Sequence, residues 1–263
     1  MDKIKTIIRK EWAEVFKNKM VLFTVAFMPL IFTVLPLVIL YTMRGESGMN
    51  EVAGDLPEQF SSMCPADLPA GECFQVYMVS QFMIMFMLIP ATIPAAIASY
   101  SIVGEKTTRT LEPLLATPIT TIELLAGKSL AAAIPGIGAT FISFGLYAIG
   151  AWFIVTNKAT FFAMMDARWL LAVFVLGPLM AFMAVFVSVM VSSRVNDPRV
   201  AEQLSMVVIL PVMLFFFGQI AGLFFISSPL VLVTALVLLI LNVLMAYLSV
   251  RLFQRETILT RWK

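Results

Sequence analysis

Long apolar stretches dominate the pattern of hydrophobic and polar positions along the chain. Their approximate bounds are 20–43, 75–103, 129–156, 169–191, 204–226 and 229–250. Each is long enough for an α-helix to cross the roughly 30 Å hydrocarbon core of a membrane, which takes about 20 residues. The runs are apolar on all faces, whereas a membrane β-strand would alternate apolar and polar residues over about ten positions. The pattern therefore predicts an all-α, polytopic membrane protein with six transmembrane helices.

Composition supports a membrane protein and excludes several functional classes. Of the 263 residues, 60% are hydrophobic and 13% are charged, whereas a soluble domain has about 25% charged residues. A soluble enzyme, a nucleic-acid-binding protein and a disordered chain are therefore poor explanations. The chain also has no histidine, the commonest general base and metal ligand. We expect no catalytic residue, no metal site and no nucleic-acid partner.

The distribution of basic residues predicts how the chain crosses the membrane. If the amino terminus is cytoplasmic, all but three of the 18 lysines and arginines lie on the cytoplasmic side, the exceptions being Arg44, Lys158 and Arg168. Such a bias follows the positive-inside rule, so both termini are predicted to be cytoplasmic. No charged residue lies deep within the six runs. This argues against ion-coupled carriers and voltage sensors, which keep ionisable groups at membrane depth.

Two segments outside the runs have features of their own. Residues 1–19 place apolar side chains on one helical face and basic ones on much of the other, which predicts an amphipathic interfacial helix. It would either anchor the first span or dock a partner. The acidic loop 44–74 is predicted to be extracytoplasmic and contains both cysteines, Cys64 and Cys73. A disulfide between them is expected on that oxidising side, with two unpaired thiols as the alternative.

The cytoplasmic segment 104–128 carries a short apolar face. Leu111, Leu114 and Leu115 are spaced i, i+3, i+4, as on one side of a helical turn. Pro118 ends that turn, and Thr120 with Glu123 predicts a capping box at the start of the helix that leads into the third span. An apolar face outside the bilayer is either sunk in the membrane interface or presented to a partner protein.

The tripeptide Gly127-Lys128-Ser129 imitates the end of a phosphate-binding loop. That loop requires a glycine five residues earlier, where this chain has Ile122. We therefore expect no ATPase site on this chain, and we interpret Lys128 as an anchor whose ammonium reaches the membrane interface.

The segment from Gly104 to Lys128 reads GEK-x-x-x-TLEPLLATP-x-x-x-x-ELL-x-GK. It resembles the signature of permease subunits of ABC-2 type ABC transporters, nearest their NatB-like and multidrug-type members. The resemblance extends to length, six-span topology and cytoplasmic termini, and so covers essentially the whole chain. In that family the segment is a coupling helix that docks on a separate cytosolic ATPase. The resemblance carries this role to Glu105, Arg109, Leu111, Glu112, Leu114 and Leu115.

The resemblance implies a function and a set of partners. The chain would be the permease subunit of an exporter in the plasma (inner) membrane of a prokaryote, moving an amphipathic or lipid-like substrate such as a drug, a peptide or a lipid-linked compound. Cytosolic ATPase subunits docking on residues 105–117 would bind ATP and Mg²⁺, so this chain would need no cofactor. A second permease, identical or homologous, and membrane lipid would complete the assembly. The alternatives are an ATP-independent channel or secondary carrier, or a non-transporting membrane scaffold.

Two further expectations concern the connections late in the chain. The second cytoplasmic loop, 192–203, would make a lesser ATPase contact through Arg194 and Arg199, unless these arginines simply follow the charge rule. Asp197 and Pro198 are a good N-cap and first residue for the fifth span. Many ABC-2 permeases insert a re-entrant helix pair between the last two spans, but here the runs leave almost no room for such an exterior gate.

Overall fold

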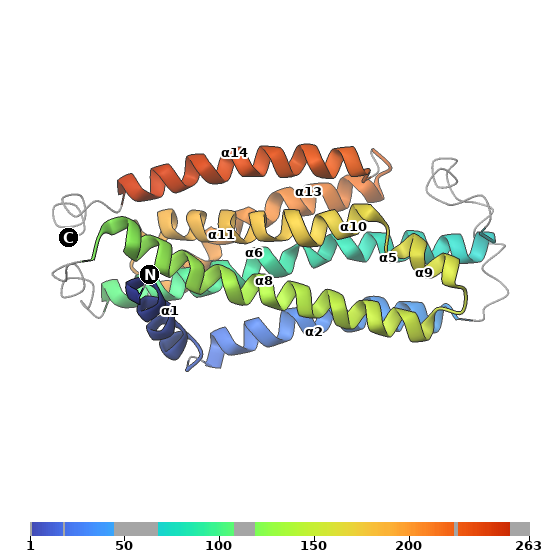
Figure 1. Cartoon of the computed structure of the whole chain (residues 1–263), viewed down its shortest axis with the longest axis horizontal. Helices are drawn as coiled ribbons and strands as arrows, with labels where there is room; N and C mark the ends of the chain where they lie inside the picture. The colour runs from blue at the N-terminus through green and yellow to red at the C-terminus, as the bar shows by residue number, and fades with distance from the viewer. Residues whose placement is uncertain (1, 18, 45–67, 108–118, 224–225, 253–263) are drawn as a thin grey trace.

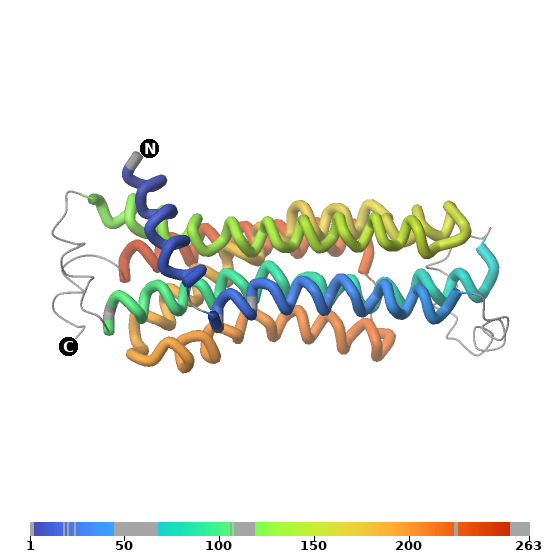
Figure 2. The backbone as a smooth tube through the Cα atoms, turned by 90° about the horizontal axis from the view of Figure 1, so that it is seen from below, coloured from blue at the N-terminus to red at the C-terminus, as the bar shows by residue number. Residues whose placement is uncertain are grey.

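The computed structural model describes residues 2–17, 19–44, 68–107, 119–223 and 226–252. Within these ranges all regular secondary structure is helical, and the long helices run side by side along one axis of an elongated bundle (Figure 1). The helix α1, Asp2–Val15, crosses one end of the bundle at a steep angle (Figure 2). The all-α fold class is confirmed.

Six helical units of the described chain are long and apolar enough to cross a membrane, as predicted. They are built from α2 (Lys19–Thr42), α5 and α6 (Ala70–Phe86 and Leu88–Thr107), α8 (Thr121–Ile154), α10, η1 and α11 (Ala167–Leu171, Ala172–Leu176 and Gly177–Ser192), α12, η2 and α13 (Pro198–Ser205, Met206–Val208 and Ile209–Ile220), and α14 (Ser228–Leu252). A short helix, α9 (Lys158–Met164), follows α8 and begins the fourth unit, which as a whole runs over Lys158–Ser192.

Prolines explain where three of these units depart from regular α-helix. A proline lacks the N–H that would bond the carbonyl four residues earlier. Pro90 follows the break between α5 and α6 at Met87, and Pro211 follows the 3₁₀ turn η2. Pro178 follows the π-helical turn η1, where Gly177 N–H donates to the Ala172 carbonyl. Other prolines, namely Pro29, Pro36, Pro94 and Pro135, lie inside continuous α-helices, so a proline alone does not specify an interruption.

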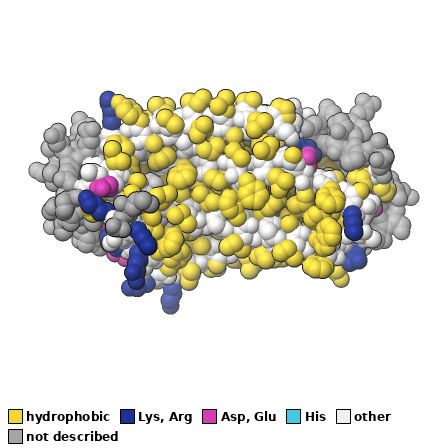
Figure 3. All heavy atoms as spheres, in the orientation of Figure 1, with side chains coloured by type: hydrophobic (Ala, Val, Ile, Leu, Met, Phe, Trp, Pro, Cys, Tyr) yellow, Lys and Arg dark blue, Asp and Glu magenta, His cyan; other side chains and the backbone are white. Residues whose placement is uncertain are grey.

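The α5–α6 unit is the centre of the bundle. α6 packs against α8, α11, α12 and α2, and the unit is buried along most of its length, including Met83, Phe86, Ile89 and Ile93. The outer helices instead expose apolar side chains, which cover the middle of the bundle while lysines and arginines appear towards its two ends (Figure 3). An apolar belt of this kind is what a helical bundle presents to lipid.

One end of the bundle holds α9 and the start of α5. There the Glu72 carboxylate accepts hydrogen bonds from the Asn157 amide, at 2.9 Å, and from the Thr160 hydroxyl, which fastens α9 to α5. Cys73 is buried in the first turn of α5. Cys64 and most of the predicted loop 44–74 lie outside the described residues, so the disulfide stays a prediction.

The connection between the last two spans leaves no space for a re-entrant helix pair. α13 ends at Ile220 and α14 begins at Ser228. Gly222 has a φ of 69°, and the Leu223 N–H donates to the Gly218 carbonyl at 3.0 Å, which closes α13 with a glycine cap. Only residues 221–227 join the two helices, so this chain lacks the length for an exterior gate at this position.

Candidate functional site

Both boundaries of the predicted coupling segment lie at the end of the bundle that carries α1. α6 ends at Thr107 and α8 begins at Thr121 (Figure 1). The predicted capping box is confirmed: the Glu123 N–H donates to the Thr120 hydroxyl at 3.2 Å, and the Thr120 N–H donates to the Glu123 carboxylate at 2.9 Å. Lys3 of α1 lies 3.6 Å from the same carboxylate. The helix start after the segment is therefore fixed locally.

Five side chains from three helices form an ion cluster beside this segment. The Lys128 ammonium of α8 lies 2.8 Å from a Glu11 carboxylate oxygen of α1 and 2.8 Å from a Glu105 oxygen of α6. It also donates to the Ser101 hydroxyl at 2.8 Å, and Ser101 donates to Glu11. The Lys10 ammonium pairs with the other Glu105 oxygen at 2.7 Å. The ion cluster therefore joins α1, α6 and α8.

Burial makes the pairing within the ion cluster obligatory. The side chains of Glu11, Glu105 and Lys128 are 4–5% exposed. A buried charge is strongly unfavourable unless it is paired and hydrogen-bonded. The two buried carboxylates are balanced by the ammonium groups of Lys128 and Lys10, and Lys10 also lies 3.8 Å from the exposed carboxylate of Glu14. Lys10 is more exposed: burial would lower its pKa, but the hydrogen bond and charge of Glu105, with the charges of Glu14 and Glu11, hold that pKa above its usual value.

A close apolar contact and a hydrogen bond also hold α1 against α8. Ile7 packs directly on Gly127 of α8, where an added Cβ would come within 2.9 Å of the Ile7 side chain. The Trp12 indole N–H donates to the Ala131 carbonyl at 2.9 Å. The buried side of α1 therefore faces α6 and α8. The helix predicted within residues 1–19 is present at Asp2–Val15, and its interfacial location stays a prediction.

Some weakly polar groups of the spans hydrogen-bond between helices, whereas Thr92, Thr140 and Thr234 each donate to a carbonyl of their own helix. The Asn242 amide donates to the Leu179 carbonyl at 3.0 Å, and the Ser188 hydroxyl donates to the Ala95 carbonyl at 3.3 Å. Gln81 of α5 and Gln219 of α13 are both buried, and their carboxamides have no hydrogen-bond partner among the described residues. The same holds for four buried hydroxyls, those of Ser129, Tyr147, Ser192 and Ser249.

The comparison with known protein families decides the identity of this bundle. The family described as ABC-2 family transporter protein matches residues 5–251, which include the whole ion cluster and all six spans except the last residue of α14. The chain belongs to the ABC-2 transporter family. No curated protein matches it in sequence. Membership makes the chain a multi-pass membrane component of a transporter, in a family without a catalytic site of its own.

The residues predicted to couple this ABC-2 chain to an ATPase fall into three groups. Glu105 lies in the ion cluster, with its carboxylate turned to Lys10 and Lys128. Arg194 and Arg199 are exposed at the same end of the bundle, and Asp197 caps α12 through the Arg199 N–H at 2.8 Å. The other five lie outside the described residues, namely Arg109, Leu111, Glu112, Leu114 and Leu115. A coupling role for all of them stays a prediction.

The interpretation of Lys128 as an interfacial anchor is wrong. Its side chain is 4% exposed and points into the protein, because the two carboxylates and Ser101 supply the polar environment that the membrane interface would otherwise give. The sequence did contain a signal for the missed partner. Glu11 stands four residues after Ile7 and four before Val15, on the apolar face of α1. An acidic residue on such a face requires a buried cation.

Proposed function

We propose that this ABC-2 chain is the transmembrane permease subunit of an ATP-driven exporter, energised by separate cytosolic ATPase subunits that dock on residues 105–117. Two permeases, identical or homologous, would enclose the transport path in the plasma membrane of a prokaryote. The single observation that carries the proposal is the ion cluster, which fixes both helices flanking the docking segment to each other and to α1.

The ion cluster offers a physical route for the coupling. A displacement of the docking segment would move the ends of α6 and α8 together, since Lys128 and Glu105 hold them in one unit. α6 in turn packs on α11, α12 and α2 at the centre of the bundle. ATP-bound and ATP-free ATPases would hold the segment in different positions, and this difference in contacts would shift the permease between conformations.

The spans support an amphipathic or lipid-like cargo. Away from the charged residues near their ends, the described spans carry hydroxyls and carboxamides as polar side-chain groups, and two carboxamides, those of Gln81 and Gln219, lack partners. Such groups suit a ligand with hydrogen-bonding atoms and a large apolar part better than a hydrated ion.

The direct test is ATPase binding by variants of the leucine face. The chain is co-expressed with the ABC ATPase subunits of the same cell and purified from membranes, as wild type and as the double variant Leu111→Asp/Leu114→Asp. Two carboxylates in an apolar contact would oppose docking, so we expect the ATPase to be lost while membrane insertion is retained. The matched control is Leu223→Asp, because Leu223 is 76% exposed at the opposite end of the bundle; it should keep the ATPase.

The rival functions predict different outcomes. If the double variant binds the ATPase as well as wild type, the docking role of this face is wrong. An ATP-independent channel or carrier would show flux that persists in vesicles depleted of ATP. A scaffold would bind the ATPase through the same face but would show no ATP-dependent flux.

A further inference from the structure

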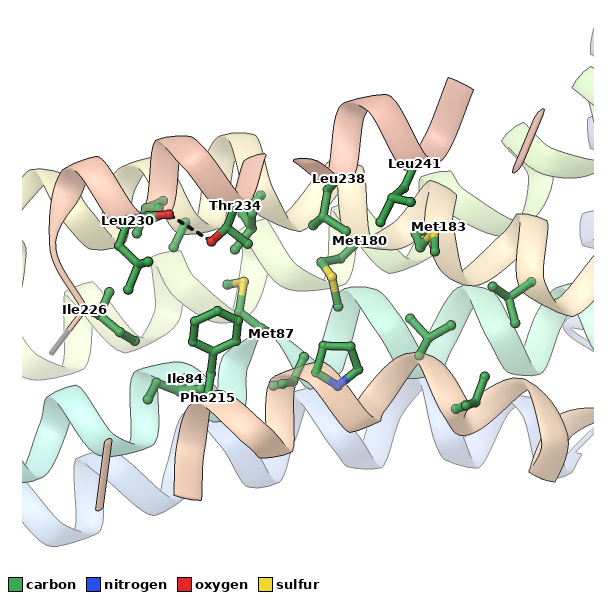
Figure 4. Close-up of a pocket in the computed structure, with 18 of the residues that line it drawn as sticks. Ile84, Met87, Met180, Met183, Phe215, Ile226, Leu230, Thr234, Leu238 and Leu241 are labelled. Atoms are coloured by element: carbon green, nitrogen blue, oxygen red, sulfur yellow. Dashed lines mark hydrogen bonds between the residues drawn. The ribbon is translucent and has the colours of Figure 1, made fainter. Parts of the chain in front are cut away.

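An apolar cavity of about 330 Å³ lies between α11, α13 and α14, beside the α5–α6 unit. Met180 of α11, Phe215 of α13 and Leu238 of α14 point into it, with Ile84 and Met87 of the α5–α6 unit behind them (Figure 4). All of these helices are membrane spans. The cavity therefore lies at membrane depth.

The lining of the cavity is almost entirely apolar, and its side-chain polar groups are the Trp169 indole N–H and the Thr234 hydroxyl. The one hydroxyl that reaches it belongs to Thr234, and this hydroxyl donates to the Leu230 carbonyl of its own helix at 2.8 Å (Figure 4). Four of the lining residues are methionines, whose flexible side chains adapt to irregular apolar ligands. A charged or strongly polar ligand would lose its hydration without compensation, so the lining selects for hydrocarbon.

The helices around the cavity leave it accessible from the membrane. α14 packs mainly on α11, and α13 packs on α5, but α13 and α14 make little direct contact with each other. The cavity lies between them and is half-enclosed, with Val207 at its edge 50% exposed. Water is absent at this depth, so the molecules that reach the opening are lipid chains.

We propose that a hydrocarbon chain of a bilayer lipid occupies this cavity and packs between α13 and α14. The volume is roughly twice the ~150 Å³ of an engineered protein cavity that binds benzene, which suits several methylene groups of one chain. If the cavity were empty, its lining atoms would lack dispersion contacts on the side that faces the cavity. The proposal rests on the membrane fold and does not depend on ATPase docking.

Trp169 provides a probe inside the cavity. It lines the cavity and is 3% exposed, so lipids that only surround the protein do not touch its indole. A chain carrying Trp12→Phe, Trp152→Phe and Trp262→Phe leaves Trp169 as the only tryptophan. This chain is reconstituted into dioleoylphosphatidylcholine vesicles, with or without bromine added across the oleoyl double bond. Because bromine quenches indole fluorescence on close approach, we expect Trp169 emission to fall in the brominated vesicles.

Two matched pairs of substitutions locate the quenching. Val231→Phe on α14 and Val212→Phe on α13 each place a ring in the cavity, because both residues line it and are nearly buried. Each should greatly reduce the quenching of Trp169. The controls on the same helices are Val233→Phe and Leu214→Phe, whose side chains face outward with 58% and 72% exposure. These controls should leave the quenching unchanged.

Three results would overturn the proposal. Trp169 emission that is equal in brominated and unbrominated vesicles would show that no lipid chain enters, as when a second copy of the chain fills the cavity. Quenching that survives in both filled variants would place the lipid elsewhere. If the triple tryptophan variant does not fold, the quenching due to Trp169 is the quenching of wild-type fluorescence minus that of the Trp169→Phe variant. A difference of zero would contradict the proposal equally.

Discussion

Lys128 is the residue on which the ion cluster depends most directly. It is the buried cation that faces both Glu11 and Glu105. Replacing it by methionine keeps an apolar stem of similar length but leaves two buried carboxylates with only Lys10 to balance them. Removing one partner of a buried ion pair costs about 3–5 kcal/mol. We therefore expect Lys128→Met to lower the free energy of unfolding by that order, measured by chemical denaturation in detergent micelles.

A second substitution separates charge balance from packing. In Lys128→Met combined with Glu11→Gln, Lys10 and Glu105 remain as a balanced pair. The double variant should therefore be more stable than Lys128→Met alone, because the uncompensated carboxylate is gone. Equal or lower stability of the double variant would mean that the pairing energy is not what holds these side chains in place.

At the residue scale, the sequence predicted contacts between residues close in the chain better than contacts between residues far apart in it. The capping box of Thr120 and Glu123 was predictable because its two members lie three residues apart in one helix start. The pairing of Glu11 with Lys128 joins residues 117 positions apart. It depends on how α1 packs across α8, which no local pattern specifies.

At the scale of elements, α6 and α8 approach closely at one glycine. A Cβ added at Gly136 of α8 would lie 2.5 Å from the Pro94 ring of α6. Overpacking of this kind costs about 1–3 kcal/mol, so Gly136→Ala should destabilise the protein. The control, two residues away on the same helix, is Gly138→Ala, since nothing lies within 4 Å of a Cβ there.

The two alanine variants are expected to differ in sign. Alanine is favoured over glycine in a helix interior by about 0.5–1 kcal/mol, so Gly138→Ala should be neutral or stabilising. Thermal unfolding followed by size-exclusion chromatography in detergent compares the two directly. Equal melting temperatures would argue that the α6–α8 contact is looser than the structure describes.

The sequence predicted the number and approximate placement of the spans because apolar runs of this length have few other uses. The cap formed by Asp197 and Pro198 did predict where the fifth helical unit begins. The apolar run, however, placed the fifth span at 204–226, whereas the helical unit runs from Pro198 to Ile220. The reason is that α12 is amphipathic: Ala201 and Ser205 face the bundle while Gln203 and Leu204 face outward. A polar helix turn that packs against protein is invisible to a hydropathy pattern.

At the scale of the whole molecule, an even number of spans places α1 and the end of α14 at the same end of the bundle (Figure 1). The excess of lysine and arginine at that end predicts that it is cytoplasmic. A fluorescent protein fused after residue 263 should therefore fold and fluoresce in cells. An alkaline phosphatase inserted near residue 55 should be active, since that enzyme needs the oxidising exterior. A non-fluorescent fusion together with an inactive phosphatase would indicate the opposite topology.

The most direct test of the proposed function is a site-specific cross-link from the docking segment. A photoreactive amino acid is placed at Leu114 in living cells, and at Leu223 as the control at the opposite end. The proposal predicts a light-dependent product from position 114 that contains an ABC ATPase, identified by peptides of its phosphate-binding loop, and none from position 223. An ATPase cross-linked from position 223 would contradict the proposal. So would the lack of any ATPase cross-link from positions 111–115 in a chain that is correctly inserted in the membrane.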